Sequence, residues 1–172
     1  ELRKGKPKTD NLQREQLPLW FAEVGKLPLV VSAYLRTLLL TGARREELAG
    51  LTWDNVDFQW NALTIKDKVE GQRVIPLTPF VSHMLAQLPR RNQWVFSSPP
   101  AASGRIQGPH VAHNKALTTA GLPHVSIHGL RRSFKSLAEW VEMPVGVVAQ
   151  IMGHKQSATA EKHYTVRPLD LL

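Results

Sequence analysis

The chain has 172 residues, of which 42% are hydrophobic, and this is enough for one compact domain with a substantial core. It has no cysteine, which excludes disulfide frameworks, thiolate nucleophiles and cysteine-ligated zinc and suits a reducing cytoplasm. Lys and Arg number 22 against 14 acidic residues, and the formal net charge of +8 favours a polyanionic partner, most commonly nucleic acid.

The first quarter of the chain is predicted to be a polar arm followed by helices. Residues 1–12 are basic and polar, so we expect a linker or arm rather than part of the core. Residues 14–26 have a helical pattern, and a second helix over residues 28–42 begins near Pro28 and stops at Gly42. The side chains expected on its buried face are Val30, Val31, Tyr34, Leu35, Leu38 and Leu39.

The hydrophobic period changes from helical to strand-like in the middle of the chain. The segment "NALTIKDKVEGQRVIPL", residues 61–77, predicts two short strands around a charged turn containing Gly71, and a further strand could precede them. Residues 97–109 are rich in Pro, Ser and Gly and are predicted to be a loop. We therefore predict an α+β fold, mainly α-helical, with a small antiparallel sheet of two to three strands. The other expected elements are helices over residues 44–51, 79–88, 109–120, 129–142, 144–152 and 157–165 and a strand over residues 92–96.

A histidine and two arginines stand together in "HGLRRSF", where a helix enters the core. At about 100° per residue, Arg131 lies about 70° from the centre of the apolar stripe, and Arg132 lies about 170° away, facing solvent. His128, one turn earlier, is the same-side neighbour of Arg131. A guanidinium at the edge of a core needs an anion, either an internal carboxylate or a phosphate at the helix N-terminus. This stretch alone leaves the two alternatives equal.

Together with "TGARREEL", "MGHKQSATAEKHY" and a lysine in the hairpin, this stretch resembles the catalytic domain of tyrosine recombinases, the phage integrase family. The resemblance covers residues 13–172, with the motifs in the family's order. The hairpin lysine corresponds to Lys68, with Lys66 as the competing choice, and the gap between the last histidine and the tyrosine is one residue longer than in many relatives. The motifs are matched by Thr41, Gly42, Arg44, Glu47 and Leu48, by His128, Leu130, Arg131 and Arg132, and by Gly153, His154 and Tyr164.

The resemblance implies a metal-independent DNA strand transferase that cleaves and rejoins DNA through a covalent 3′-phosphotyrosyl intermediate. Tyr164 is the implied nucleophile, since Tyr34, the only other tyrosine, belongs to a core-facing helix. The arginines would stabilise charge on the phosphoryl oxygens, the histidines would exchange protons or donate to the phosphate, and Lys68 would protonate the leaving 5′ oxygen. Glu47 would brace the arginines. The implied catalytic set is Arg44, Lys68, His128, Arg131, His154 and Tyr164.

No metal or cofactor is expected, because the resemblance implies that bond energy is kept in the phosphotyrosine. The chain has no phosphate-binding G-x-x-x-x-G-K-[ST] loop and no H-E-x-x-H, and His110 and His113 are interpreted as surface or DNA-backbone histidines. Three alternatives stay open: a type IB topoisomerase-like nicking and closing enzyme, a non-catalytic DNA-binding module on the same fold, and a metal-dependent nuclease, which EDTA would inactivate.

The resemblance also predicts the partners. We expect double-stranded DNA attachment sites, and a cytoplasmic, nucleoid-associated integrase of a phage or genomic island with no membrane association. Relatives act as tetramers on synapsed DNA with an N-terminal core-binding domain, which is absent from residues 1–172, so this domain alone is expected to be monomeric. The expected DNA contacts are Lys115, Arg132, Lys135 and Lys155, whereas Trp53, Trp60, Trp94 and Trp140 are interpreted as core or sheet packing.

Overall fold

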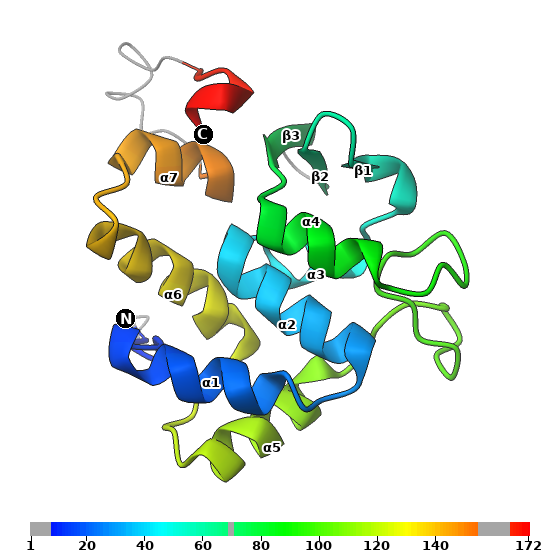
Figure 1. The fold of residues 1–172 in the computed structure, drawn as a ribbon, viewed down its shortest axis with the longest axis vertical. Helices are drawn as coiled ribbons and strands as arrows, with labels where there is room; N and C mark the ends of the chain where they lie inside the picture. The colour runs from blue at the N-terminus through cyan, green and yellow to red at the C-terminus, as the bar shows by residue number, and fades with distance from the viewer. Residues whose placement is uncertain (1–7, 69–70, 155–165) are drawn as a thin grey trace, which may run out of the picture.

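A computed structural model describes residues 8–68, 71–154 and 166–172, and it shows helices packed around a central helix with a small sheet at one side (Figure 1). This confirms the predicted α+β class with mainly helical content. No helix in these ranges is both long and apolar enough to cross a membrane. In chain order the elements are η1 (Arg14–Gln16), α1 (Leu17–Val24), α2 (Leu29–Thr41), α3 (Arg45–Ala49), η2 (Trp53–Asn55), β1 (Val56–Asp57), β2 (Ala62–Asp67), β3 (Gly71–Pro76), α4 (Pro79–Ala86), α5 (Pro109–Ala120), α6 (Ile127–Trp140), α7 (Val145–Met152) and η3 (Leu169–Leu171).

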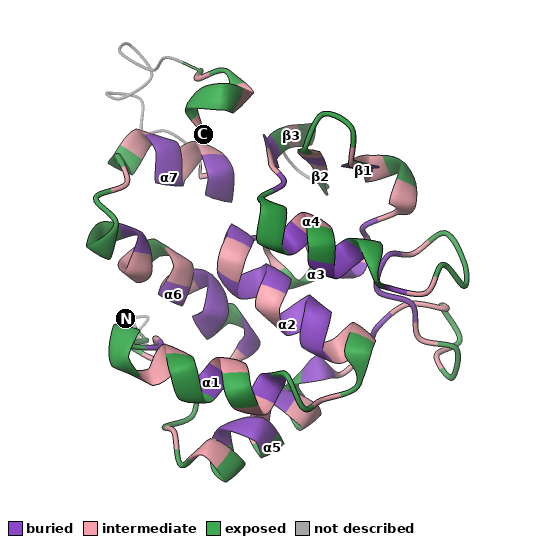
Figure 2. Cartoon of the chain, in the orientation of Figure 1, coloured by how far each residue is buried: buried purple, intermediate pink, exposed green. Residues whose placement is uncertain are grey.

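Helix α2 is the centre of the fold, and it packs against α1, α3, α4, α5 and α6. Most of its length is buried (Figure 2), because its side chains are nearly all apolar or small. The helix begins after Pro28 and ends at Gly42, as predicted, and the φ of 65° at Gly42 is one that glycine adopts without strain. A Cβ at this position would lie 2.5 Å from Phe134 of α6, so the glycine also permits the two helices to approach closely.

The sheet is antiparallel in the order β1-β2-β3, which confirms the predicted hairpin with a third strand before it. The register pairs Ile65 with Arg73 and Asp67 with Gly71. Ile65 is buried and Lys66 exposed, as the two-residue period of a half-buried strand requires. β3 begins at Gly71, which pairs with Asp67, the last residue of β2. Lys68 directly follows β2 and therefore lies at the end of the hairpin.

The predicted strand over residues 92–96 is wrong. Its main chain forms one isolated antiparallel bridge, between Thr52 and Trp94. The pairing ends there because the partner segment turns at once into the 3-10 helix η2, whose hydrogen bonds are local. The predicted helix over residues 157–165 lies outside the described residues.

Residues 10–12 pack onto α6 and do not form a free arm. Leu12 is buried, and its backbone N–H donates to Ser133 Oγ at 2.8 Å. The Asp10 carboxylate accepts hydrogen bonds from the backbone N–H of Ser126 at 2.9 Å and from its hydroxyl at 2.6 Å. Because Ser126 is the N-cap of α6, this carboxylate stabilises the start of the helix, which begins two residues before its predicted start.

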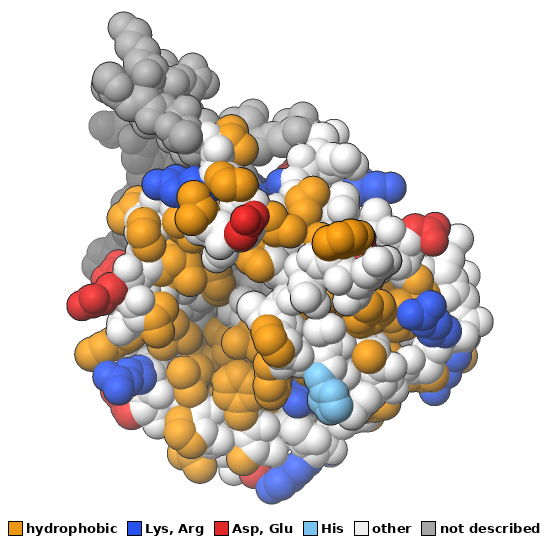
Figure 3. Space-filling model, turned by 45° about the horizontal axis from the view of Figure 1, so that its top comes forward, with side chains coloured by type: hydrophobic (Ala, Val, Ile, Leu, Met, Phe, Trp, Pro, Cys, Tyr) orange, Lys and Arg blue, Asp and Glu red, His pale blue; other side chains and the backbone are white. Residues whose placement is uncertain are grey.

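Hydrophobic side chains gather on the face of the molecule that Figure 3 shows. A groove of about 390 Å³ runs between α1, α2 and α6, and its lining includes Phe21, Leu40 and Trp140. The interpretation of the tryptophans as packing residues is wrong for Trp60 and Trp140, which are exposed. The tryptophan that does fill the core is Trp20 of α1.

Candidate active site

Arg44 lies at the N-terminus of α3, and two carboxylates accept hydrogen bonds from its guanidinium. Its Nη1 donates to Glu47 Oε1 at 2.9 Å and to Asp67 Oδ2 at 3.1 Å, and its backbone N–H donates to Glu47 Oε2 at 2.8 Å. The predicted brace from Glu47 is therefore present. The Arg44 side chain is still 37% exposed, so it is both oriented and open to an incoming anion.

Arg131 is buried in α6 and is anchored by a main-chain carbonyl. Its residue is 5% exposed, and Nη1 donates to the carbonyl oxygen of Gly42 at 2.5 Å. Burial, followed by the positive charge of Arg44, lowers the pKa of Arg131 to about 10, so the guanidinium is charged at neutral pH. A neutral carbonyl orients this charge without cancelling it, and the anchor that the structure gives Arg131 is thus not the internal carboxylate considered above.

The two motif histidines lie at helix ends next to these arginines. His128 is the second residue of α6 and is exposed, whereas His154 follows Gly153 at the end of α7 and is half-buried. The pKa of each is lowered, first by burial and then by nearby cations, among which Arg131 acts on both. The lowered pKa values favour neutral imidazoles at pH 7, which can accept a proton or donate a single N–H.

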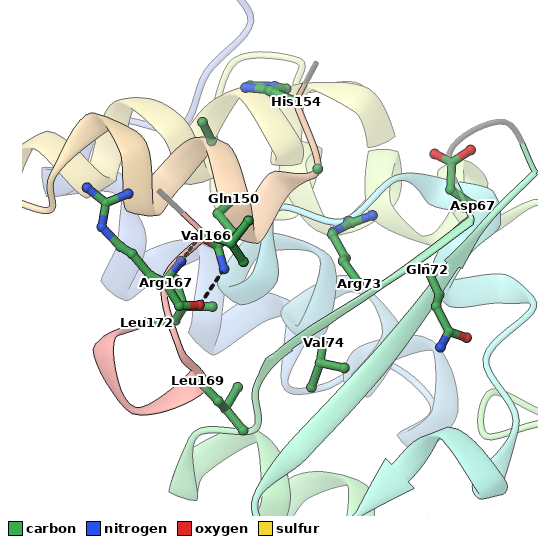
Figure 4. Close-up of a pocket in the computed structure, with 12 residues that line it drawn as sticks. Asp67, Gln72, Arg73, Val74, Gln150, His154, Val166, Arg167, Leu169 and Leu172 are labelled. Atoms are coloured by element: carbon green, nitrogen blue, oxygen red, sulfur yellow. Dashed lines mark hydrogen bonds between the residues drawn. The ribbon is translucent and has the colours of Figure 1, made fainter. Parts of the chain in front are cut away.

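Arg73 of β3 is a site residue that the sequence analysis missed. Its Nη1 and Nη2 donate to the two oxygens of Glu47 at 2.9 and 2.8 Å, and its Nε donates to the carbonyl oxygen of Ile151 at 2.8 Å. Figure 4 shows the side chain reaching from β3 toward the end of α7. A Cβ on Gly153, whose φ is 67°, would lie 2.8 Å from Arg73 Nη1, so the turn before His154 rests directly on this guanidinium.

Glu47 is consequently shared by two guanidiniums. Burial opposes its ionisation, but the hydrogen bonds from Arg73 and from the Arg44 backbone outweigh burial and lower the pKa of the carboxyl below its ordinary value. The signal for Arg73 was available in the sequence. It stands two residues before the buried Ile75 in a strand, so it is in phase with a buried face where a guanidinium needs a carboxylate.

The hairpin lysines are both close to this centre. Lys66 of β2 and Lys68 are exposed, and together with Arg44 and Asp67 they line a groove of about 430 Å³. The choice between the two lysines stays a prediction. Tyr164 and Lys155 lie outside the described residues.

A second hollow, of about 410 Å³, lies between the hairpin and the end of α7, and His154 lines it (Figure 4). Its wall includes the C-terminal segment 166–172. The side-chain amide of Gln150 donates to the carbonyl oxygen of Arg167 at 2.8 Å and accepts from its backbone N–H at 2.9 Å. The chain that follows the predicted nucleophile is thus fastened to α7, the helix that ends at His154.

Two of the predicted surface positions are placed differently by the structure. The Arg132 guanidinium does not face open solvent: it pairs with the Asp10 carboxylate and lies 3.3 Å from Ser126 Oγ. His113 is fully buried and accepts a hydrogen bond from Trp20 Nε1 at 3.0 Å, so its interpretation as a surface histidine is wrong. Both partners come from distant segments, which helix periodicity does not reveal. His110, Lys115 and Lys135 are exposed, and for the two lysines DNA contact stays a prediction.

The described residues show no cluster of three or more His, Asp and Glu side chains that could hold a metal ion. What they do show is two guanidiniums, Arg44 before α3 and Arg131 in α6, close enough for the charge of Arg44 to lower the pKa of Arg131. The charges of both arginines also lower the pKa values of His128 and His154, and the hairpin lysines share a groove with Arg44. Such an arrangement can bind the non-bridging oxygens of a phosphodiester and move protons beside it.

Comparison with known proteins agrees with this geometry. Prophage integrase IntF of Escherichia coli (strain K12) is 60% identical over 171 residues, which cover 95% of this chain and 36% of that protein. Tyrosine recombinase XerC of Mycobacterium sp. (strain KMS) is 28% identical over 151 residues, or 77% of this chain and 48% of that protein. The chain thus spans between about a third and a half of the length of these relatives.

Solved structures share the fold at low sequence identity. The XerH site-specific recombinase bound to difH substrate in a pre-cleavage complex has a TM-score of 0.74 at 18% identity, covering 94% of this chain and 51% of that one. The lambda integrase catalytic core has a TM-score of 0.66 at 15% identity, covering 85% and 96%. Residues 10–168 match the sequence profile described as "Phage integrase family". Because this match extends over most of the chain, the protein belongs to the phage integrase family.

Proposed function

We propose that this chain is the catalytic domain of a site-specific DNA recombinase that cleaves and rejoins DNA through a covalent 3′-phosphotyrosyl intermediate. The observation that supports this most directly is the convergence of Arg44 and Arg131. One guanidinium is braced by Glu47 and the other by the carbonyl of Gly42, so both are oriented before any substrate arrives. Preorganised charge of this kind is usually the largest contribution to catalysis of acyl or phosphoryl transfer.

In the proposed reaction, the Tyr164 oxygen attacks the scissile phosphorus and the bond to the 5′ oxygen breaks. The phenol proton passes to a base, for which the neutral imidazole of His128 is suited, and Lys68 or Lys66 gives a proton to the leaving 5′ oxygen. Arg44 and Arg131 stabilise the negative charge on the two non-bridging oxygens. The reverse attack by a 5′-hydroxyl of a second duplex rejoins the strands with no net change in the number of phosphodiester bonds.

The biological role that we propose is integration or excision of phage or genomic-island DNA at attachment sites. IntF, the relative at 60% identity, is a prophage integrase, and its length leaves room for a separate DNA-binding region outside the stretch matched here. One lambda integrase structure is a tetramer bound to a Holliday junction. We accordingly expect the full-length protein to act as a tetramer on two duplexes in the bacterial cytoplasm, with the isolated domain monomeric.

Covalent trapping tests the proposal. The parent protein is incubated with a nicked duplex taken from the junction of the mobile element with its host DNA, so that the cleaved fragment diffuses away. A denaturant-resistant protein–DNA adduct is expected, insensitive to EDTA and abolished by Tyr164→Phe. An equal yield from Tyr164→Phe, or no adduct with any junction duplex, would reject the assignment. Relaxation of supercoiled plasmid without a specific site would instead favour a type IB topoisomerase-like enzyme.

A further inference from the structure

The groove beside Arg44 extends past the catalytic residues to a tryptophan and an arginine that the proposed chemistry does not use. Arg44 is the N-cap of α3 and Gly50 is its C-cap, and a Cβ on Gly50 would lie 3.0 Å from Arg105 Nη1. Arg44 and Gly50 flank the five residues of α3, so Arg105 lies at the opposite end of this short helix from the Arg44 backbone. The groove is lined by Arg44, Glu46, Glu47, Gly50, Lys66, Asp67, Lys68, Trp94 and Arg105.

The Arg105 guanidinium lies over an aromatic ring. Its carbon lies 5.4 Å from the centre of the Trp94 ring, within the range of a cation–π contact. A guanidinium in contact with a ring face can still offer N–H groups to a phosphate. The contact with the ring restricts the Arg105 side chain before DNA binds and so reduces the entropy that binding would cost.

Several hydrogen bonds connect the two ends of the loop that carries Trp94 and Arg105. Trp94 Nε1 donates to the Ser103 carbonyl oxygen at 3.1 Å, and the Asn92 side-chain amide donates to the Gly104 carbonyl oxygen at 2.8 Å. Arg105 itself forms an antiparallel bridge with Ser97. These contacts tie Trp94 and Asn92 to residues 103 and 104, which directly precede Arg105 in the chain.

The charge of Arg105 is only weakly compensated. Its nearest carboxylate partner is Glu46, at 3.6 Å between Nη2 and Oε2, and the Glu46 side chain is 67% exposed. Exposed pairs of this kind contribute about 0–1 kcal/mol and are readily exchanged for another anion. Lys66 and Lys68, both exposed, line the same groove, and among its acidic residues only Glu46 is exposed.

From these observations we infer that the Trp94–Arg105 pair is a binding site for a backbone phosphate of the DNA strand that passes through this groove beside the scissile phosphate. Arg105 contacts the phosphate, and Trp94 is a positioning residue that orients it. The inference rests on the proposed function, since the strand in the groove is the one presented to Arg44. It assigns no base preference, because phosphate contacts position the DNA without reading its sequence.

Binding is measured by fluorescence anisotropy with a random-sequence duplex of about 30 base pairs, in a Tyr164→Phe background so that no covalent step contributes. Arg105→Gln is expected to weaken binding about tenfold at low salt and to reduce the slope of log affinity against log salt by about one. The matched control is Arg90→Gln, because Arg90 stacks on Trp53 at 4.5 Å but lies outside the groove. This control is expected to leave the affinity within about twofold, as for a solvated surface charge.

Two further variants separate a phosphate site from general surface charge. Glu46→Gln is expected to strengthen binding, and most of that gain should vanish when Arg105→Gln is also present, since the two side chains act on one phosphate. Trp94→Leu is expected to weaken binding only while Arg105 is in place. If Arg105→Gln perturbs folding by circular dichroism, Arg105→Lys serves instead, compared with Arg90→Lys. Because it keeps the charge and loses the planar fork, it is expected to leave the salt slope unchanged and to weaken binding more than Arg90→Lys does, and equal affinities of the two lysine variants would then overturn the inference.

Equal losses from Arg105→Gln and Arg90→Gln, or an unchanged salt slope, would overturn the inference in favour of a diffuse basic surface. These outcomes are independent of the proposed chemistry. If Arg105 sets the salt slope but Tyr164 forms no adduct, then the phosphate site stands and the recombinase assignment fails. If the adduct forms with Arg105→Gln at unchanged duplex affinity, the recombinase assignment stands and the phosphate site fails.

Discussion

Replacing Arg73 with methionine would leave the Glu47 carboxylate with one of its two guanidinium partners. The Glu47 side chain is 5% exposed and accepts hydrogen bonds from both Nη atoms of Arg73. Removing one partner of a buried ion pair costs about 3–5 kcal/mol, and because Arg44 still bonds the same carboxylate we expect about 3 kcal/mol. The Ile151 carbonyl loses its donor as well, which adds about 1 kcal/mol. The expected loss of unfolding free energy is therefore about 4 kcal/mol.

Urea denaturation followed by circular dichroism measures this loss. Arg90→Met on the surface is the control and should cost less than about 0.5 kcal/mol. The second variant, Glu47→Gln in the Arg73→Met background, should recover part of the stability, because it removes a buried charge that Arg44 alone compensates only in part. The pKa of Glu47 is lowered in the folded state, so the stabilisation it provides is present above its unfolded pKa and is lost as pH falls through the folded value. A cost below about 1 kcal/mol, or a further loss on adding Glu47→Gln, would refute this account of Arg73.

Two more predictions concern stability. Burial lowers the pKa of His113 to about 4, so its unfolded form takes up a proton near pH 6.5 while the folded form does not; stability should fall by about 1.4 kcal/mol per unit as pH drops from about 6.5 to 4. Urea midpoints across that range check this, and an equally steep fall in His113→Gln, which keeps an acceptor near Trp20, would contradict it. Gly42→Ala should cost at least about 2 kcal/mol, because it adds a clash with Phe134 to an unfavourable φ, whereas Gly121→Ala, at φ 68° in open space, should show only the backbone cost of about 1 kcal/mol. Equal melting-temperature losses in the two alanine variants would show that the contact with Phe134 is unimportant.

The local parts of the fold were predictable because they depend on local spacing. The start and stop of α2 followed from Pro28 and Gly42, and the hairpin followed from the change to a two-residue period. The position of Arg131 at the border of the core was predictable from the apolar stripe of its helix, whereas Arg44 was singled out by the family resemblance, and the catalytic role of both stays a prediction.

The missed features are contacts between distant segments. Arg73 and Glu47 are 26 residues apart, and Asp10 and Arg132 are 122 residues apart, so no helical or strand period relates them. A linker or arm was expected for residues 1–12 because they are basic and polar, and in the described part, residues 8–12, the packing depends on the buried side chain of Leu12. Which carboxylate meets which guanidinium is decided by tertiary packing, and only a rule about buried charge could have pointed to Arg73 in advance.

The carbonyl that orients Arg131 belongs to the residue at which α2 terminates. One residue more or less in that helix would carry its terminal oxygen about 100° around the axis and about 1.5 Å along it, away from the guanidinium. Homologous chains should therefore vary freely in the length of the connection between α4 and α5, while insertions and deletions within the last turns of α2 should be eliminated even when every motif residue is retained.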